Sequence, residues 1–130
     1  MLRWEIEGEE VRQLLALSAE ERAVTFFQLV ADWEEAWGLK SSEGWIVSRE
    51  TEALPLWPHP ELAAACACGA WENAVPEAVP IDELLEDLLL LLEEDGLGLA
   101  VFPTSKDSGT VMPLGEFRER LEKELELGEW

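Results

Sequence analysis

The residues best suited to chemistry lie in one short stretch, ALPLWPHPELAAACACG at positions 53–69, which holds the only histidine of the chain and both of its cysteines. A zinc site usually takes four ligands, often as a C-x-x-C pair with a second pair elsewhere. Here a C-x-C and one histidine stand without a second pair. If Cys66 and Cys68 are helical, their side chains point about 200° apart, so one ion does not easily reach both. We therefore predict that the cysteines pack as small hydrophobic residues, without a metal or a cofactor.

His59 stands between Pro58 and Pro60, where a strand is expected to pass into a helix. Nucleophilic catalysis needs the imidazole within hydrogen-bond reach of an activated serine, threonine or cysteine. None of the serines lies in a G-x-S-x-G or comparable context. The favoured interpretation is that His59 serves the helix start, and the alternative is that the turn around it is a small recognition feature.

Carboxylate pairs such as Glu34 and Glu35 occur throughout the sequence. Glycoside hydrolysis needs two carboxyl groups held about 5 to 9 Å apart across a cleft, with separated pKa values. Because the chain has 29 acidic residues, such pairs arise by chance. The carboxylates alone therefore predict no catalytic site.

The spacing of apolar residues predicts the helices that position these residues. Ser18 and Glu21 form a capping box, and a buried helical stripe follows at the i, i+3, i+4, i+7 spacing: Ala23, Phe26, Phe27 and Val30. A short helix over about 9–17 precedes it. Further helices are predicted over about 61–68, over about 82–94 after the proline-containing AVPEAVP, and over 114–127.

Two of these helices carry candidate surface residues. Leu90 is placed opposite the broad apolar arc of its helix, which consists of Ile81, Leu84, Leu85, Leu88, Leu89, Leu91 and Leu92. The last helix has an apolar stripe of Phe117, Leu121 and Leu125, and its other faces carry Glu116, Glu119, Glu122 and Glu126. Leu90 and the acidic face are therefore candidate contact surfaces.

Alternation and turn residues predict five strands. Two strands around 37–39 and 45–47 form a hairpin, a third covers 53–57, and a fourth over 97–102 pairs with a fifth over 109–112. Pro55 removes one ladder donor, which favours an edge position or a bulge. With no repeat or linker, residues 1–130 are predicted to be a single α+β domain with about five mainly antiparallel strands in one sheet and helices packed on it.

The net charge of the chain limits the classes of partner that it can bind. With 29 acidic and 9 basic residues the formal net charge is −20, which repels the phosphates of nucleic acids and anionic membranes. No run approaches about 18 consecutive apolar residues, and the start lacks a secretory signal. We expect a cytoplasmic protein that binds neither nucleic acid nor membrane. The charge serves solubility, adaptation to salt, or attraction to a basic protein.

Seven tryptophans stand in a chain without tyrosine. Those at positions 37, 45 and 57 fall on predicted strands, where aromatic side chains stabilise cross-strand pairs, so most tryptophans are expected to be in the core or half-buried. Trp4, Trp71 and Trp130 lie in poorly patterned segments and are the candidates for an exposed recognition patch.

Several blocks occur in the order seen in the bacterial family called domain of unknown function 2750: ADWEEAWGL, GWIV, ALPLWPHPELA, VPIDELLEDLLLLLEEDG and LAVFPT. The chain resembles this family over about 24–125, and ADWEE and LPLWPHPE are the most specific parts. The resemblance implies a small α+β fold and a bacterial origin. It implies no activity and transfers no site residues.

Three functions remain open. The leading hypothesis is a non-catalytic cytoplasmic protein-interaction module, such as an inhibitor or immunity-type partner of a basic protein. One alternative is a small enzyme that uses acidic residues and His59 in a pocket. The other is a self-associating module, a homodimer joined through Leu90 and exposed tryptophans. The candidate interaction residues are His59, Trp71, Leu90, Glu116, Glu119 and Glu122.

Overall fold

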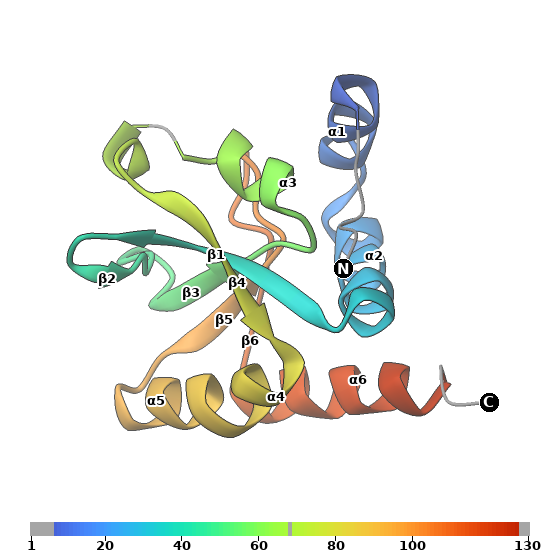
Figure 1. Cartoon of the computed structure of the whole chain (residues 1–130), viewed down its shortest axis with the longest axis vertical. Coiled ribbons are helices and arrows are strands. Elements are labelled where there is room, and N and C mark those ends of the chain that lie inside the picture. Colours follow the sequence, from blue (N-terminus) through green and yellow to red (C-terminus); the bar gives the residue numbers. More distant parts are fainter. Residues whose placement is uncertain (1–6, 68, 128–130) are drawn as a thin grey trace.

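Two three-stranded sheets form the centre of the protein, and helices pack around them (Figure 1). The computed structural model describes residues 7–67 and 69–127. The α+β class predicted from the sequence is confirmed. Within the described ranges, none of the helices combines the length and the apolar character that a membrane span requires.

The first sheet has the strand order β2-β1-β4 and is antiparallel throughout. Its central strand β1 (Glu35–Ser41) pairs on one side with the two-residue β2 (Gly44–Trp45), which confirms the predicted hairpin. On the other side it pairs with β4 (Val75–Pro80). Four successive residues of β1, 36–39, are buried, so both faces of this strand are covered.

The second sheet has the order β3-β5-β6. Its strands are β3 (Ala53–Leu56), β5 (Gly98–Val101) and β6 (Thr110–Met112). The middle strand β5 runs parallel to β3 and antiparallel to β6. Pro55 therefore lies on an edge strand, opposite Ala100, as its missing N–H predicted.

The prediction of one sheet with about five strands is wrong. The described part of the chain contains six strands divided between two sheets. The sheets meet where the Trp37 N–H donates to the Trp57 carbonyl at 2.8 Å and the Trp57 N–H donates to the Trp37 carbonyl at 2.7 Å. The strand missed from the sequence is β4, which lies within AVPEAVP.

The prolines of β4 lie where a strand tolerates them. Pro76 and Pro80 stand opposite Leu39 and Glu35 on an edge strand. The backbone N–H and C=O groups of β1 at odd-numbered positions point away from β4. The Trp37 N–H donates to the Trp57 carbonyl, and the Leu39 carbonyl accepts from the N–H of Ile46, which follows β2. In an alternating antiparallel ladder the missing proline N–H groups then face outward and cost no hydrogen bond.

The helices lie close to their predicted positions. Before the sheets come α1 (Gly8–Leu15) and α2 (Ala19–Trp33), α3 (Pro60–Ala65) follows β3, and α6 (Leu114–Leu127) ends the described chain. Residues 81–94 form α4 (Ile81–Glu83), a π turn (Leu84–Leu88) and α5 (Leu89–Glu94) in succession. The capping box is confirmed, since Ser18 Oγ accepts from the Glu21 N–H at 3.1 Å and Glu21 Oε1 accepts from the Ser18 N–H at 3.2 Å.

The predicted apolar stripes of α2 and α6 meet in the core. Phe26, Phe27 and Phe117 are at most 1% exposed, and their ring centroids lie 5.2 to 5.9 Å apart in edge or tilted arrangements. Aromatic rings prefer these arrangements because the positive ring edge meets the negative ring face. Their packing joins α2 to α6.

Phe102 and Pro103, the two residues that follow β5, accept hydrogen bonds from three separate elements; we call these two residues the β5 corner. The Arg22 Nε of α2 donates to the Phe102 carbonyl at 3.0 Å. The Trp57 indole N–H and the Cys66 thiol both donate to the Pro103 carbonyl, at 2.9 and 3.4 Å. The corner thus links α2, the end of β3 and the end of α3.

Arg22 is the buried cation of this corner. It is 2% exposed, donates to the Leu17 carbonyl at 2.6 Å and forms an ion pair with Asp107 in the loop before β6. A buried guanidinium is tolerated when its donors are used. Here two backbone carbonyls and one carboxylate take them.

We expect Arg22→Met to be strongly destabilising. The apolar replacement leaves the Phe102 and Leu17 carbonyls without their donor, at about 1–3 kcal/mol for each acceptor left unpaired. The matched variant Asp107→Asn keeps a side-chain oxygen for Arg22 and leaves both carbonyl contacts in place, so it should cost less than Arg22→Met. Urea unfolding measures both; equal losses would show that the ion pair and not the carbonyl contacts carries the stability.

Candidate interaction site

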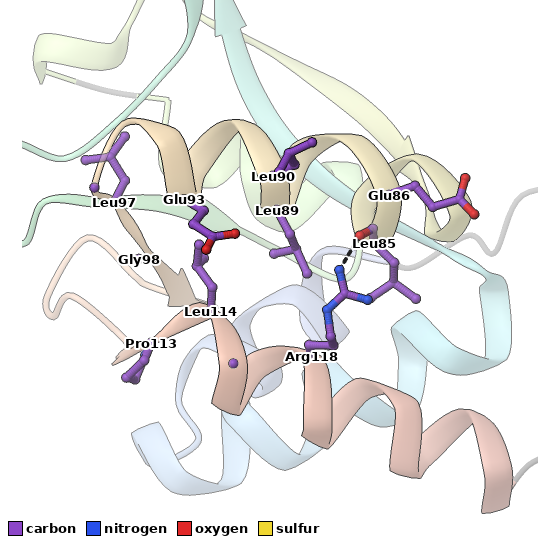
Figure 2. A pocket seen from close by; sticks show the side chains of 12 residues that line it. Leu85, Glu86, Leu89, Leu90, Glu93, Leu97, Gly98, Pro113, Leu114 and Arg118 are labelled. Atoms are coloured by element: carbon purple, nitrogen blue, oxygen red, sulfur yellow. Dashed lines mark hydrogen bonds between the residues drawn. The ribbon is translucent and has the colours of Figure 1, made fainter.

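A groove of about 810 Å³ lies between the 81–94 helix and the start of α6 (Figure 2). Leucines form most of its apolar lining, and two carboxylates and one guanidinium also line it. We call it the leucine groove; its main residues are Leu85, Leu89, Leu90, Leu97, Leu114, Glu86, Glu93 and Arg118. The volume lies within the roughly 300–1,000 Å³ of typical ligand sites.

Arg118 connects the two walls of the groove. Its Nη2 donates to the backbone carbonyl of Leu85, which lies in the π turn (Figure 2). Its Nη1 lies 3.9 Å from Glu122 Oε2 on the next turn of α6. A π turn is rare and frequently marks a functional site. In this protein it lies in the wall of the groove, held by a side chain from the opposite wall.

The π turn also decides which leucines are exposed. Leu90 is 55% exposed, which confirms its predicted position outside the apolar arc. Leu91 was predicted within the arc, and this is wrong because it is 48% exposed. A π turn has more residues per turn than an α-helix, so residues after it are rotated back relative to the regular wheel. Leu91 thereby leaves the core and joins Leu90 at the surface.

The predicted acidic residues of α6, Glu116, Glu119, Glu122 and Glu126, are exposed, whereas Phe117 and Leu121 are buried. At about 100° per residue, Glu122 lies about 40° and Glu119 about 100° from Arg118 around the helix. Glu116 lies about 160° away and faces a different side. Arg118 and Leu90 line the groove, and Glu122 lies beside it through its contact with Arg118, whereas Glu119 and Glu116 lie progressively farther around α6.

His59 is the N-cap of α3. Its Nδ1 accepts the N–H of Glu61 at 3.0 Å, and the residue is 3% exposed. The predicted role at the helix start is confirmed. His59 does not line the leucine groove, and its role in recognition stays a prediction.

Cys66 is 5% exposed and lies at the C-cap of α3, which supports its predicted packing as a small core residue. The helix ends earlier than predicted, at Ala65. Cys68 lies outside the described residues. Within residues 7–67 and 69–127, no group of three or more histidine, cysteine, aspartate or glutamate residues is arranged so that it could hold a metal ion.

Trp71 is half-buried in a short 3₁₀ turn (Gly69–Trp71) and lies between two hollows. The smaller, of about 290 Å³, also includes residues of the 103–108 loop; we call it the Trp71 hollow. Trp37 and Trp57 are buried, at 6% and 0% exposed, as predicted. Trp4 and Trp130 lie outside the described residues.

Sequence reasoning missed Arg118 and Leu97 as groove residues. The available signal for Arg118 was its spacing, four residues after Leu114 and four before Glu122, at the border of the apolar stripe. No signal in the sequence pointed to the π turn, because its hydrophobic pattern is compatible with a regular helix.

The fold and the groove define a small α+β protein with an acid-lined apolar groove on its surface. Residues 23–121 match the model of the family described as "Protein of unknown function (DUF2750)", and the chain belongs to that family. The resemblance found in the sequence is thereby confirmed. No curated protein and no solved structure matches the chain.

The two neighbours Leu89 and Leu90 provide a matched test of the groove geometry. Leu89 is 4% exposed, so Leu89→Ala should lower the free energy of unfolding by about 2–5 kcal/mol. Leu90→Ala should change it by no more than about 0.5 kcal/mol, as an exposed side chain does. Chemical unfolding of both variants tests this, and a loss of several kcal/mol for Leu90→Ala would show that Leu90 is buried.

We further expect that the protein, purified without chelator, carries no stoichiometric zinc. Cys66 has a hydrogen-bond partner in the Pro103 carbonyl and is packed in the core, and the chain offers no second cysteine or histidine pair to complete a zinc site. Elemental analysis is the measurement. One zinc per chain that disappears in the Cys66→Ser, Cys68→Ser double variant would contradict the expectation.

Proposed function

We propose that this protein is a non-catalytic cytoplasmic interaction module that binds a basic partner protein at the leucine groove. The observation that carries the proposal is the 55% exposure of Leu90 at the edge of an acid-lined apolar groove. Exposed apolar surface with a charged surround is typical of protein-binding sites. An inhibitor or immunity-type role is one form that such binding takes.

Charge complementarity defines the partner. Glu86 and Glu93 line the groove, and Glu122 flanks it. Arg118 also lines it, but its guanidinium is engaged by the Leu85 carbonyl and by Glu122. A segment with apolar side chains at helical spacing and lysine or arginine beside them satisfies both the leucines and the carboxylates.

Self-association is the second candidate, because Leu90 and Leu91 are both exposed apolar side chains, although they line different hollows of the surface. Two copies of a chain with net charge −20 repel each other, which favours the basic partner over a homodimer. A dimer that light scattering detects and that Leu90→Glu converts to a monomer would support self-association instead.

The enzyme alternative gains no support from the position of His59. Its Nδ1 serves as the cap of α3, and the residue lines neither the leucine groove nor the Trp71 hollow.

The first test compares wild-type protein and Leu90→Glu as baits in a lysate of the source organism. The expected partner is a basic protein that the wild type retains and that Leu90→Glu loses, because a carboxylate then occupies the apolar edge of the groove. A partner that is acidic, or that both baits retain equally, would contradict binding at the groove.

The second test concerns the acidic face of α6. Reversing Glu119, Glu122 and Glu126, which lie within about 100° of Arg118 around the helix, to lysine should slow association with that partner, by about tenfold or more at low salt if steering operates. The matched control reverses Glu7, Glu9 and Glu10 at α1, which lies at the opposite end of the molecule from α6 (Figure 1). This control changes the net charge equally and should slow association less.

Salt completes the charge test. Association of the wild type should slow as ionic strength rises, since charges are screened over about 10 Å at 0.1 M salt. Circular dichroism confirms that both triple variants fold. If the two variants associate at equal rates and the rate does not depend on salt, the acidic charge does not steer the partner and serves solubility only.

A further inference from the structure

A second hollow borders the 81–94 helix, and we call it the Leu91 hollow. It has a volume of about 200 Å³, and its lining consists of Trp45, Val79, Glu83, Asp87, Leu88 and Leu91. None of these residues lines the leucine groove. Four of the six residues are apolar, and Leu91 is 48% exposed. The hollow is therefore a separate apolar depression that has two carboxylates in its lining.

The apolar lining of the Leu91 hollow is fixed by the fold. Val79 of β4 is 2% exposed and Leu88 of the π turn is 5% exposed, so both are anchored in the core. Trp45 of β2 packs on the core from outside. Its ring lies so close to Gly38 of β1 that a Cβ at position 38 would be 2.8 Å from Cζ3 of the indole. Because these residues are held by packing, a partner that enters the hollow does not have to order them.

The two carboxylates of the hollow lack a cation. Glu83 and Asp87 are both exposed, and in the part of the chain that the structure describes neither of them forms an ion pair. Lys40 lies 5.1 Å from the centroid of the Trp45 ring, but it pairs with Glu77, at 3.1 Å. Two carboxylates that line one small hollow repel each other, and a cation bound between them relieves this repulsion.

An arginine side chain matches both the apolar and the acidic part of the lining. Its methylene groups pack on apolar surface while its charged end stays near water. Its guanidinium is more weakly hydrated than the ammonium group of lysine, and it pairs with carboxylates through several N–H donors. It is also attracted to the indole ring of a tryptophan. The hollow therefore favours arginine over lysine.

We propose that the Leu91 hollow binds an arginine side chain of the basic partner protein, with Glu83 and Asp87 as its ion-pair partners and the apolar residues against its methylene groups. The inference rests on the proposed function, and it adds a second contact on the helix that forms one wall of the leucine groove. A partner that uses both contacts spans Leu90 and Leu91, which are neighbours in the chain and line different hollows.

The test titrates the full chain, labelled with ¹⁵N, with Nα-acetylarginine amide. The signals of the Trp45 indole N–H and of the Asp87 and Leu91 amides should shift and saturate. Two matched probes change only the end of the side chain: Nα-acetylcitrulline amide carries an uncharged urea group, and Nα-acetyllysine amide carries an ammonium group. Both should bind at least about fivefold more weakly than the arginine probe.

A pair of double variants tests the position of the site. Glu83→Gln with Asp87→Asn should lower the affinity for the arginine probe about fivefold or more, because it removes both ion-pair partners. The control, Asp82→Asn with Glu94→Gln, removes the same charge from exposed positions of the same helix that line neither the hollow nor the groove. It should bind the arginine probe as the wild type does, and circular dichroism confirms that both double variants fold.

The inference is overturned if the three signals do not shift saturably, if either matched probe binds as tightly as the arginine probe, or if the two double variants lose the same affinity. Its failure differs from that of the proposed function. A basic partner that Leu90→Glu releases, together with a failed titration, would leave the leucine groove in place and overturn only the arginine site. A successful titration without such a partner would overturn the leucine groove instead.

Discussion

The β5 corner is the constraint on which the rest of the structure depends. Two consecutive carbonyls, of Phe102 and Pro103, lie in the interior, where backbone acceptors must find donors. Arg22, Trp57 and Cys66 supply them from three elements that are distant in sequence. The corner therefore fixes the second sheet against α2 and α3, and it also shapes the loop that forms one wall of the Trp71 hollow.

Trp57 carries this constraint into the first sheet, because its backbone pairs with Trp37 of β1. β1 in turn positions β4 through their antiparallel pairing, and the end of β4 leads directly into the 81–94 helix. The start of that helix is fixed to the start of β1, because the Ile81 N–H donates to the Glu34 carbonyl at 3.0 Å. The wall of the leucine groove is thus positioned through backbone hydrogen bonds. Arg118 completes the arrangement by joining that helix to α6.

The cations of this acidic chain are largely used within the fold. Arg22 serves the β5 corner, Lys40 pairs with Glu77 at 3.1 Å and lies over the Trp45 ring, and Arg120 lies 4.5 Å from the centroid of Phe27. Arg22 is buried by these contacts, whereas the Lys40 side chain stays 43% exposed beside Glu77. The carboxylates of α6 and of the 81–94 helix are left to dominate the surface around the groove.

The amino-acid sequence by itself determined the features that depend on neighbours in the chain: the Ser18 capping box, the stripes of α2 and α6, the hairpin of β1 and β2, the edge position of Pro55 and the exposure of Leu90. Each of these is local, because spacing alone decides which side chains share a face. Only the tertiary structure decided the division into two sheets, the strand at β4, the exposure of Leu91 and the role of Arg118. Proline is compatible with β4 because that strand has one paired edge, and Leu91 is exposed after a π turn that a regular helical wheel does not include. Such choices depend on partners far away in the sequence, which hydrophobic periodicity does not encode.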